Sequence, residues 1–171
     1  ADYRLISQGG WGVLTGWDNN PYHNIPSCYE KICGIVHGEA NETLGAMKPY
    51  AFSSWKPDAV IVNLGTNDAS AFNQPLWQDL NTGESFKQYM NPDGSYEEVS
   101  LKRLQKAVTD FLALIRKNNP DSYIVWIYGM LGYELTLPIT DAINSYRKLT
   151  GDNKVSFLQL PATTDETVGS R

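Results

Sequence analysis

The chain has 171 residues, a length typical of one domain with a single hydrophobic core. A net charge of −5 and a pI near 5.0, without basic runs, argue against a nucleic-acid partner or an anionic membrane surface. No apolar run approaches the roughly 20 residues that a membrane-spanning helix needs. We therefore predict a single domain over residues 1–171 that binds neither nucleic acid nor membrane.

A predicted strand over residues 3–6 leads into a glycine-rich turn over residues 7–12. Glycine adopts backbone conformations that other residues avoid, and it lets the backbone approach a ligand closely. The turn is therefore either a ligand-binding turn or a structural connection between a strand and a helix.

The segment after this turn holds every cysteine and histidine of the chain: His23, Cys28, Cys33 and His37. Ser27 and Glu30 have the spacing of a capping box, which predicts a short helix over residues 27–36 that ends at Gly38. A zinc site is one alternative, but the four residues between the cysteines lie at the edge of the usual ligand spacing. Two small semi-buried cysteines are the simpler interpretation, and we predict no metal site.

The central element of the sequence is a short apolar run over residues 59–64, between Pro57 and Gly65. Its β-branched composition predicts a strand buried on both faces of a parallel sheet. Ligands in such sheets bind beyond the carboxyl ends of the strands, where Asn67 and Asp68 follow. Asn67 can direct an amide N–H at developing negative charge, although both side chains could instead bond their own backbone.

Residues 69–95 form a long polar connection, with a possible helical turn at residues 85–90. Connections of this length in compact domains are usually functional or disordered. Phe72 and Trp77 could stack on a substrate, or they could simply attach a surface insertion to the domain. The tryptophans beside the glycine turn, Trp11 and Trp17, have the same two interpretations.

The last part of the chain alternates between helical and strand patterns. Ser95 and Glu98 form a second capping box that opens a long amphipathic helix. A strand over residues 123–128, a helix over about 139–149 and a strand over 155–160 follow. This alternation predicts an α/β protein with a three-layer α/β/α, doubly wound parallel sheet.

Residues 55–68 read Trp-Lys-Pro-Asp, an apolar strand and Gly-Thr-Asn-Asp. This closely resembles the third signature block of the SGNH, or GDSL-type, hydrolases. The Lys-Pro-Asp sequence is most similar to that of the acetyl esterases of carbohydrate esterase family 2, and residues 2–18 resemble the family's second block. The resemblance covers nearly the whole chain and implies a flavodoxin-like SGNH hydrolase fold.

In this family the glycine turn and the turn after the central strand supply the N–H donors of the oxyanion hole. The resemblance therefore implies this role for the backbone N–H of Gly10, with Gly12 as the alternative, and for the amide of Asn67. No cofactor is implied.

The family's nucleophilic serine precedes the segment that resembles residues 3–6, and its histidine base follows the last strand, usually before a proline. We expect the chain to be an SGNH catalytic domain without its first strand and last helix, with His-Pro directly after Arg171. Asp165 is not at the family's Asp-x-x-His spacing from that histidine. A backbone carbonyl could then orient the base, which would give a Ser-His dyad.

The resemblance implies an esterase that removes O-acetyl groups from polysaccharides such as xylan or glucomannan. Its expected partners are an acetylated polysaccharide or oligosaccharide and further segments of the same parent chain, in a secreted or periplasmic setting. Trp11, Trp17, Trp77 and Asp68 are the expected substrate contacts. An SGNH lipase or thioesterase, or an inactive sugar-binding module with this fold, are the alternatives.

Overall fold

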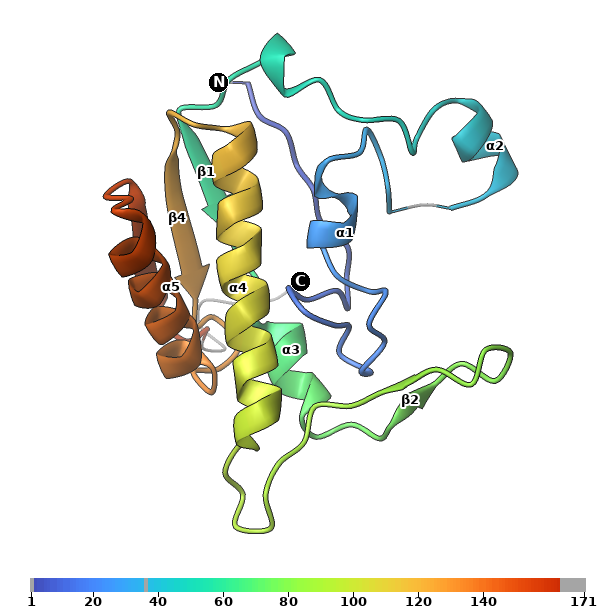
Figure 1. The fold of residues 1–171 in the computed structure, drawn as a ribbon, viewed down its shortest axis with the longest axis vertical. Helices are drawn as coiled ribbons and strands as arrows, with labels where there is room; N and C mark the ends of the chain where they lie inside the picture. Colours follow the sequence, from blue (N-terminus) through green and yellow to red (C-terminus); the bar gives the residue numbers. More distant parts are fainter. Residues whose placement is uncertain (1, 36, 164–171) are drawn as a thin grey trace.

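We describe the chain from a computed structural model, which covers residues 2–35 and 37–163. Within these residues a parallel sheet contains β1 (Ala59–Val62), β4 (Tyr123–Tyr128) and β5 (Val155–Gln159), in the order β1-β4-β5 (Figure 1). Residue 59 pairs with residue 123, and residue 124 pairs with residue 155. The predicted α/β class with parallel strands is confirmed.

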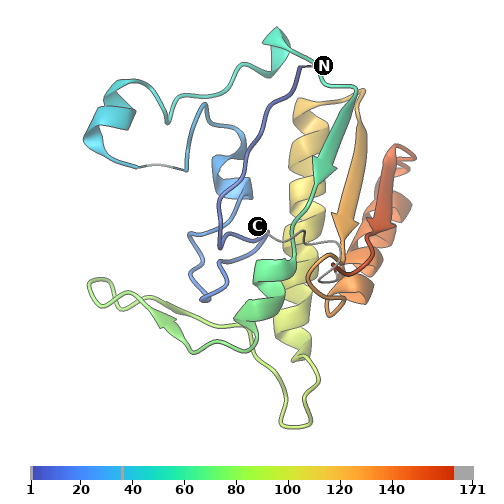
Figure 2. The ribbon, with the colours of Figure 1, turned by 180° about the vertical axis from the view of Figure 1, so that it is seen from behind.

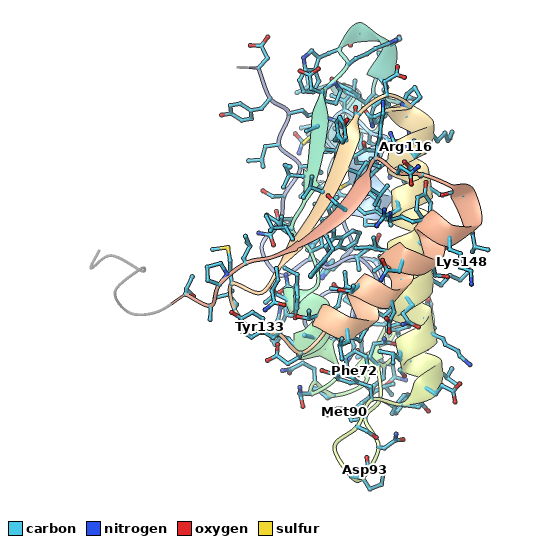
Figure 3. The ribbon with its side chains drawn as sticks, turned by 90° about the vertical axis from the view of Figure 1, so that its left-hand side faces the viewer. Phe72, Met90, Asp93, Arg116, Tyr133 and Lys148 are labelled. Atoms are coloured by element: carbon cyan, nitrogen blue, oxygen red, sulfur yellow. The ribbon has the colours of Figure 1, made fainter. Side chains whose placement is uncertain are left out.

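Two long helices, α4 (Glu98–Asn118) and α5 (Thr136–Thr150), cover one face of this sheet (Figure 3). Each connects one strand to the next, and both crossovers move across the sheet in the same direction. Right-handed crossovers in one direction place their helices on the same face. Two layers are therefore visible in the described part of the chain, and the third layer stays a prediction.

The core lies between the sheet and these two helices. Its fully buried members include Leu104, Val108, Leu112 and Ile115 of α4, Ile124, Trp126 and Tyr128 of β4, Ile139 and Ile143 of α5, and Val155 of β5. The indole N–H of Trp126 donates to the carbonyl oxygen of Leu64 at 3.0 Å, which satisfies its buried polar atom. None of the helices in the described residues is long and apolar enough to span a membrane.

The other helices are short: α1 (Pro26–Tyr29), α2 (Glu39–Thr43), α3 (Thr66–Ala71) and the 3-10 helix η1 (Phe52–Ser54). The predicted helix over residues 27–36 is wrong, because α1 is a single turn; residue 36 lies outside the described residues, as does Asp165. Both predicted capping boxes are also wrong. The hydroxyl of Ser27 donates to the carbonyl oxygen of Asn24, and the hydroxyl of Ser95 donates to Asp93.

Residues 3–6 do not form the predicted strand. They run extended beside the sheet (Figure 2). The side chain of Arg4, and no ladder of backbone hydrogen bonds among the described residues, holds them there. The guanidinium of Arg4 donates to the carbonyl oxygens of Tyr29 at 3.2 Å and Lys31 at 2.7 Å. Its central carbon also lies 3.6 Å from the centre of the Tyr50 ring, a cation–π contact.

The long connection after Asp68 contains the end of α3 and an antiparallel hairpin of β2 (Trp77–Gln78) and β3 (Ser85–Phe86). The predicted helical turn at residues 85–90 is therefore wrong. The hairpin extends away from the sheet in Figure 1.

Asn19 attaches this connection to the domain at both of its ends. Its buried amide nitrogen donates to the carbonyl oxygens of Ala71 at 2.8 Å and Pro75 at 3.0 Å. Its amide oxygen accepts the backbone N–H of Gln88 at 3.0 Å. Asn19 also has a φ of 66°, a left-handed conformation that asparagine tolerates better than most residues.

We expect Asn19→Ala to lower the free energy of unfolding by about 1–3 kcal/mol, because buried backbone groups on both sides of the connection would lose their partner. Urea denaturation measures this change. Asn81→Ala, at an exposed position of the hairpin, is the matched control and should change the stability by less than about 0.5 kcal/mol. Equal effects of the two substitutions would contradict the anchoring role.

Candidate active site

The turn that follows β1 depends on a glycine. Gly65 has a φ of 129°, and a Cβ added there would lie 2.8 Å from Cδ1 of Ile139 and 3.0 Å from Cε2 of Tyr128. Only glycine fits both the backbone conformation and the space. The chain can therefore turn sharply into α3, whose first residues carry the side chains of Asn67 and Asp68 to the glycine turn.

Asn67 contacts the glycine turn directly. Its amide nitrogen donates to the carbonyl oxygen of Trp11 at 2.8 Å. A primary amide has two N–H groups, so this bond fixes the orientation of the side chain and leaves a second donor. Asn67 also lines a cavity of about 940 Å³.

Asp68 has a different position from the one we expected. Its side chain is only 1% exposed, and its carboxylate accepts the backbone N–H groups of Val13 at 2.9 Å, Leu14 at 2.8 Å and Thr15 at 3.3 Å. Burial raises the pKa of this carboxyl, while the three N–H donors act in the opposite direction. This corrects the expected substrate contact: Asp68 holds the polypeptide that follows the glycine turn.

The two glycines considered for the oxyanion hole differ in how their N–H groups are used. The N–H of Gly12 donates to the carbonyl oxygen of His23 at 3.3 Å, and a Cβ on Gly12 would lie 2.3 Å from Oδ2 of Asp68. The N–H of Gly10 has no acceptor within the described residues, while its carbonyl oxygen accepts the N–H of Trp17 at 2.9 Å. A free N–H makes Gly10 the better donor for a ligand.

The aromatic residues expected at the substrate separate into two groups. Trp11 stacks on His23, with ring centres 5.3 Å apart, and Trp17 is 49% exposed beside Gly10. Trp77 lies on β2 against Tyr22, with ring centres 5.8 Å apart, and lines neither of the cavities that border the glycine turn.

Phe72 is not available for stacking on a substrate. It is 3% exposed and packs on Tyr96, with ring centres 4.4 Å apart, near the lower end of α4 in Figure 3. The alternative interpretation, an aromatic that attaches the connection to the domain, is therefore correct for this residue.

Two cavities border the glycine turn. The first, of about 940 Å³, is lined by residues 2–8, by β1, and by Asn67 and Asn119 among others. The second, of about 490 Å³, is lined by Gly10, Trp17, Asp18 and His23 among others. Gln8 and Trp11 line both cavities, so the two spaces are neighbours across the turn.

The segment with the cysteines and histidines provides no metal centre in the described part of the chain. No three residues of the metal-binding types His, Cys, Asp and Glu come together there. Cys28 is buried and Cys33 is exposed, and both are free thiols. The interpretation as two semi-buried cysteines is therefore wrong, because one of them is fully buried and the other is exposed.

Sequence reasoning did not identify Asp18 as a residue of the second cavity. Asp18 reaches this position because the turn at residues 16–20 closes through backbone bonds, such as Gly16 N–H to the carbonyl oxygen of Asn20 at 2.9 Å. No periodic pattern in the sequence carries that information.

Comparisons with models of protein families and with curated proteins found no match. Solved structures do match. Over 97% of its length the chain is 54% identical to Est2A, an acetyl xylan esterase from the rumen bacterium Butyrivibrio proteoclasticus, with a TM-score of 0.93. The chain covers 45% of Est2A.

Two family two carbohydrate esterases share the fold at lower identity. The Clostridium thermocellum enzyme, solved with cellohexaose, has a TM-score of 0.61 and 22% identity over 92% of this chain. The Cellvibrio japonicus enzyme has a TM-score of 0.62 and 19% identity over 92% of this chain.

This chain is a relative of the family 2 carbohydrate esterases. The resemblance seen in the sequence is thereby confirmed. The chain spans less than half of each of these three proteins, namely 45%, 39% and 38% of their chains.

Proposed function

We propose that the protein is a carbohydrate O-acetyl esterase that removes acetyl groups from xylan, glucomannan or a related polysaccharide. The observation that carries this proposal is the 54% identity to an acetyl xylan esterase over 97% of the chain. Because xylan is a polymer outside the cell that uses it, the proposal includes a secreted or periplasmic location.

The proposed reaction is acyl transfer. A serine hydroxyl attacks the acetyl carbonyl carbon while a histidine takes its proton, and the carbonyl oxygen becomes an oxyanion. The N–H of Gly10 and the free amide N–H of Asn67 would donate to this oxyanion. The sugar hydroxyl then leaves with the proton from histidine, and water releases acetate from the serine in the same way.

The first cavity offers space for the segment that carries the serine. Within the described residues β1 pairs with β4 on one edge only, and residues 60–62 line the cavity along the other edge. Ile61 is 58% exposed, although β-branched residues of parallel sheets are normally covered. We propose that a further strand of the same protein fills this cavity and ends beside Asn67.

The proposal predicts different activities for the 171-residue chain and for the complete protein that contains it. Release of acetate from 4-nitrophenyl acetate and from acetylated xylan should be detectable for the complete protein alone, because the expected serine and histidine lie outside these 171 residues. Activity of the shorter chain would overturn our assignment of the catalytic groups.

The same assay tests the alternative classes. Hydrolysis of long-chain 4-nitrophenyl esters in preference to acetate would favour a lipase or thioesterase. Binding of xylan without hydrolysis by the complete protein would favour a sugar-binding module.

A further inference from the structure

Cys28 and Cys33 lie at the two ends of a tight turn, residues 28–33, which we call the cysteine turn. The N–H of Lys31 donates to the carbonyl oxygen of Cys28 at 3.0 Å, which bends the chain back on itself. A Cβ added to Gly34 would lie 2.9 Å from Cβ of Cys28 and 3.1 Å from its Cα. Consecutive Cα atoms are about 3.8 Å apart, so Cys33 is separated from this contact by only one residue.

The short length of α1 makes this arrangement possible. In a continuous helix over residues 27–36, each residue would turn the chain by about 100°, and the two cysteines would point in directions about 140° apart. Because α1 ends at Tyr29, the chain returns toward Cys28 instead. Disulfides need close Cα atoms, usually about 4.4–6.8 Å apart, and a tight turn can satisfy this requirement after a small movement of an exposed residue.

The two thiols differ in how easily an oxidant reaches them. Cys28 is 2% exposed, and its thiol donates a weak hydrogen bond to the carbonyl oxygen of Ile25 at 3.2 Å. Burial raises the pKa of this thiol, which disfavours the reactive thiolate. Cys33 is exposed. An oxidant therefore reacts first with Cys33, and Cys28 is the second partner.

The cysteine turn also carries both carbonyl groups that hold Arg4. Its guanidinium donates to the carbonyl oxygens of Tyr29 at 3.2 Å and Lys31 at 2.7 Å, and both acceptors lie between the two cysteines in the chain. Arg4 belongs to residues 2–8, which line the first cavity. A covalent bond across the turn would restrict the movement of both acceptors, and through them the movement of this segment.

We propose that Cys28 and Cys33 form a disulfide under oxidising conditions, and that this bond fixes the turn that holds Arg4. Disulfides form in secreted and periplasmic proteins, which is the location proposed above. The inference concerns the stability of one wall of the first cavity and does not depend on the esterase reaction.

The bond forms by thiol–disulfide exchange with a small disulfide such as oxidised glutathione. The thiolate of Cys33 attacks one glutathione sulfur, forms a mixed disulfide and releases the first glutathione as a thiol. The thiol of Cys28 then loses its proton and attacks the sulfur of Cys33, and the second glutathione leaves and takes up a proton. The two cysteine sulfurs are oxidised, and one molecule of oxidised glutathione is reduced to two thiols.

Peptide mapping of the complete protein tests whether the bond forms. The protein is incubated with oxidised glutathione, its remaining thiols are alkylated during unfolding, and it is digested with trypsin. Cleavage after Arg4, Lys31 and Lys48 places the two cysteines in different peptides, residues 5–31 and 32–48. We expect these peptides to be joined and two hydrogen atoms lighter than their sum. Glutathione on Cys33 together with an alkylated Cys28 would contradict the disulfide.

Limited proteolysis of the folded protein tests the effect on Arg4. Trypsin must release the Arg4 side chain from the cysteine turn before it cleaves after this residue, and local opening of this kind controls proteolysis. Cleavage after Arg4 should be about fivefold slower in the oxidised protein than in the protein reduced with dithiothreitol. Equal rates in a protein whose peptides are joined would overturn the proposed role of the bond.

Cys33→Ser is the matched control, since residue 33 is exposed and its replacement leaves the buried Cys28 in place. Oxidised glutathione should neither join the two peptides in this variant nor slow cleavage after Arg4. If cleavage slowed as much as in the wild type, the cause would lie outside the cysteine pair, and the proposal would be wrong.

Discussion

Asn67→Ala is expected to lower kcat of the complete protein by about a hundredfold or more, since loss of one oxyanion donor typically costs about 2.7–4 kcal/mol of transition-state stabilisation. The amide of Asn67 is oriented by its bond to the carbonyl oxygen of Trp11. A donor fixed in this way needs no reorganisation when charge develops on the substrate. The effect should appear in kcat, with KM for 4-nitrophenyl acetate nearly unchanged, because the charge exists only in the transition state.

Asn73→Ala is the control for this measurement. Asn73 follows α3 directly and its side chain is exposed. Its removal should leave kcat within about twofold, since surface substitutions away from special features usually have small effects. A decrease of less than about threefold for Asn67→Ala would refute the oxyanion role.

Asp68→Ala is expected to lower the free energy of unfolding by about 3 kcal/mol or more, because the backbone N–H groups of residues 13–15 would lose their acceptor in a buried place. Activity should fall as well, since those residues continue the turn that contains Gly10. Urea denaturation and kcat for 4-nitrophenyl acetate measure the two effects.

Asp68→Asn tests whether the carboxylate itself is needed. Its amide oxygen can still accept the N–H groups of Leu14 and Thr15, but its NH₂ group would face the N–H of Val13, a contact between two donors. We expect a smaller loss of stability than for alanine. Asp121→Ala, at an exposed position, is the control. If it lowered the free energy of unfolding as much as Asp68→Ala, the proposed role of Asp68 in holding the turn would be contradicted.

The sequence correctly predicted the strands and helices whose secondary structure is determined by their own residues. The strand over residues 123–128 has the predicted bounds, and β1 ends only two residues earlier than expected, at Val62. In both cases a continuous apolar run marks a strand of a parallel sheet. The predicted burial of the strand over residues 59–64 on both faces is wrong within the described residues, because only Val62 of β1 is buried and Ile61 is 58% exposed. The helix α5 begins at Thr136, a few residues before its predicted start, because the chain turns into it directly after Leu135, which is itself fully buried.

Prediction from the sequence was wrong where the conformation or contacts of a residue depend on residues far away in the chain. Residues 3–6 include the apolar Leu5 and Ile6, but a strand also needs a neighbouring strand to pair with, and the side chain of Arg4 holds this segment instead. The role of Asp68 could not be predicted either, because its hydrogen-bond donors lie 53–55 residues earlier in the chain. A local pattern such as Gly-Thr-Asn-Asp indicates where a site is, but it does not show which side chain faces the substrate.

Within the described residues one edge of β1 has no partner strand, which affects how these 171 residues behave in solution. Open strand edges with apolar side chains pair readily with other chains, and natural proteins usually cover them. In Figure 2 β1 lies at one edge of the sheet. Ile61 of this strand is more than half exposed. A protein made of these residues alone would therefore associate more strongly as its concentration rises, and the further strand that we propose for this edge would also protect the protein from aggregation.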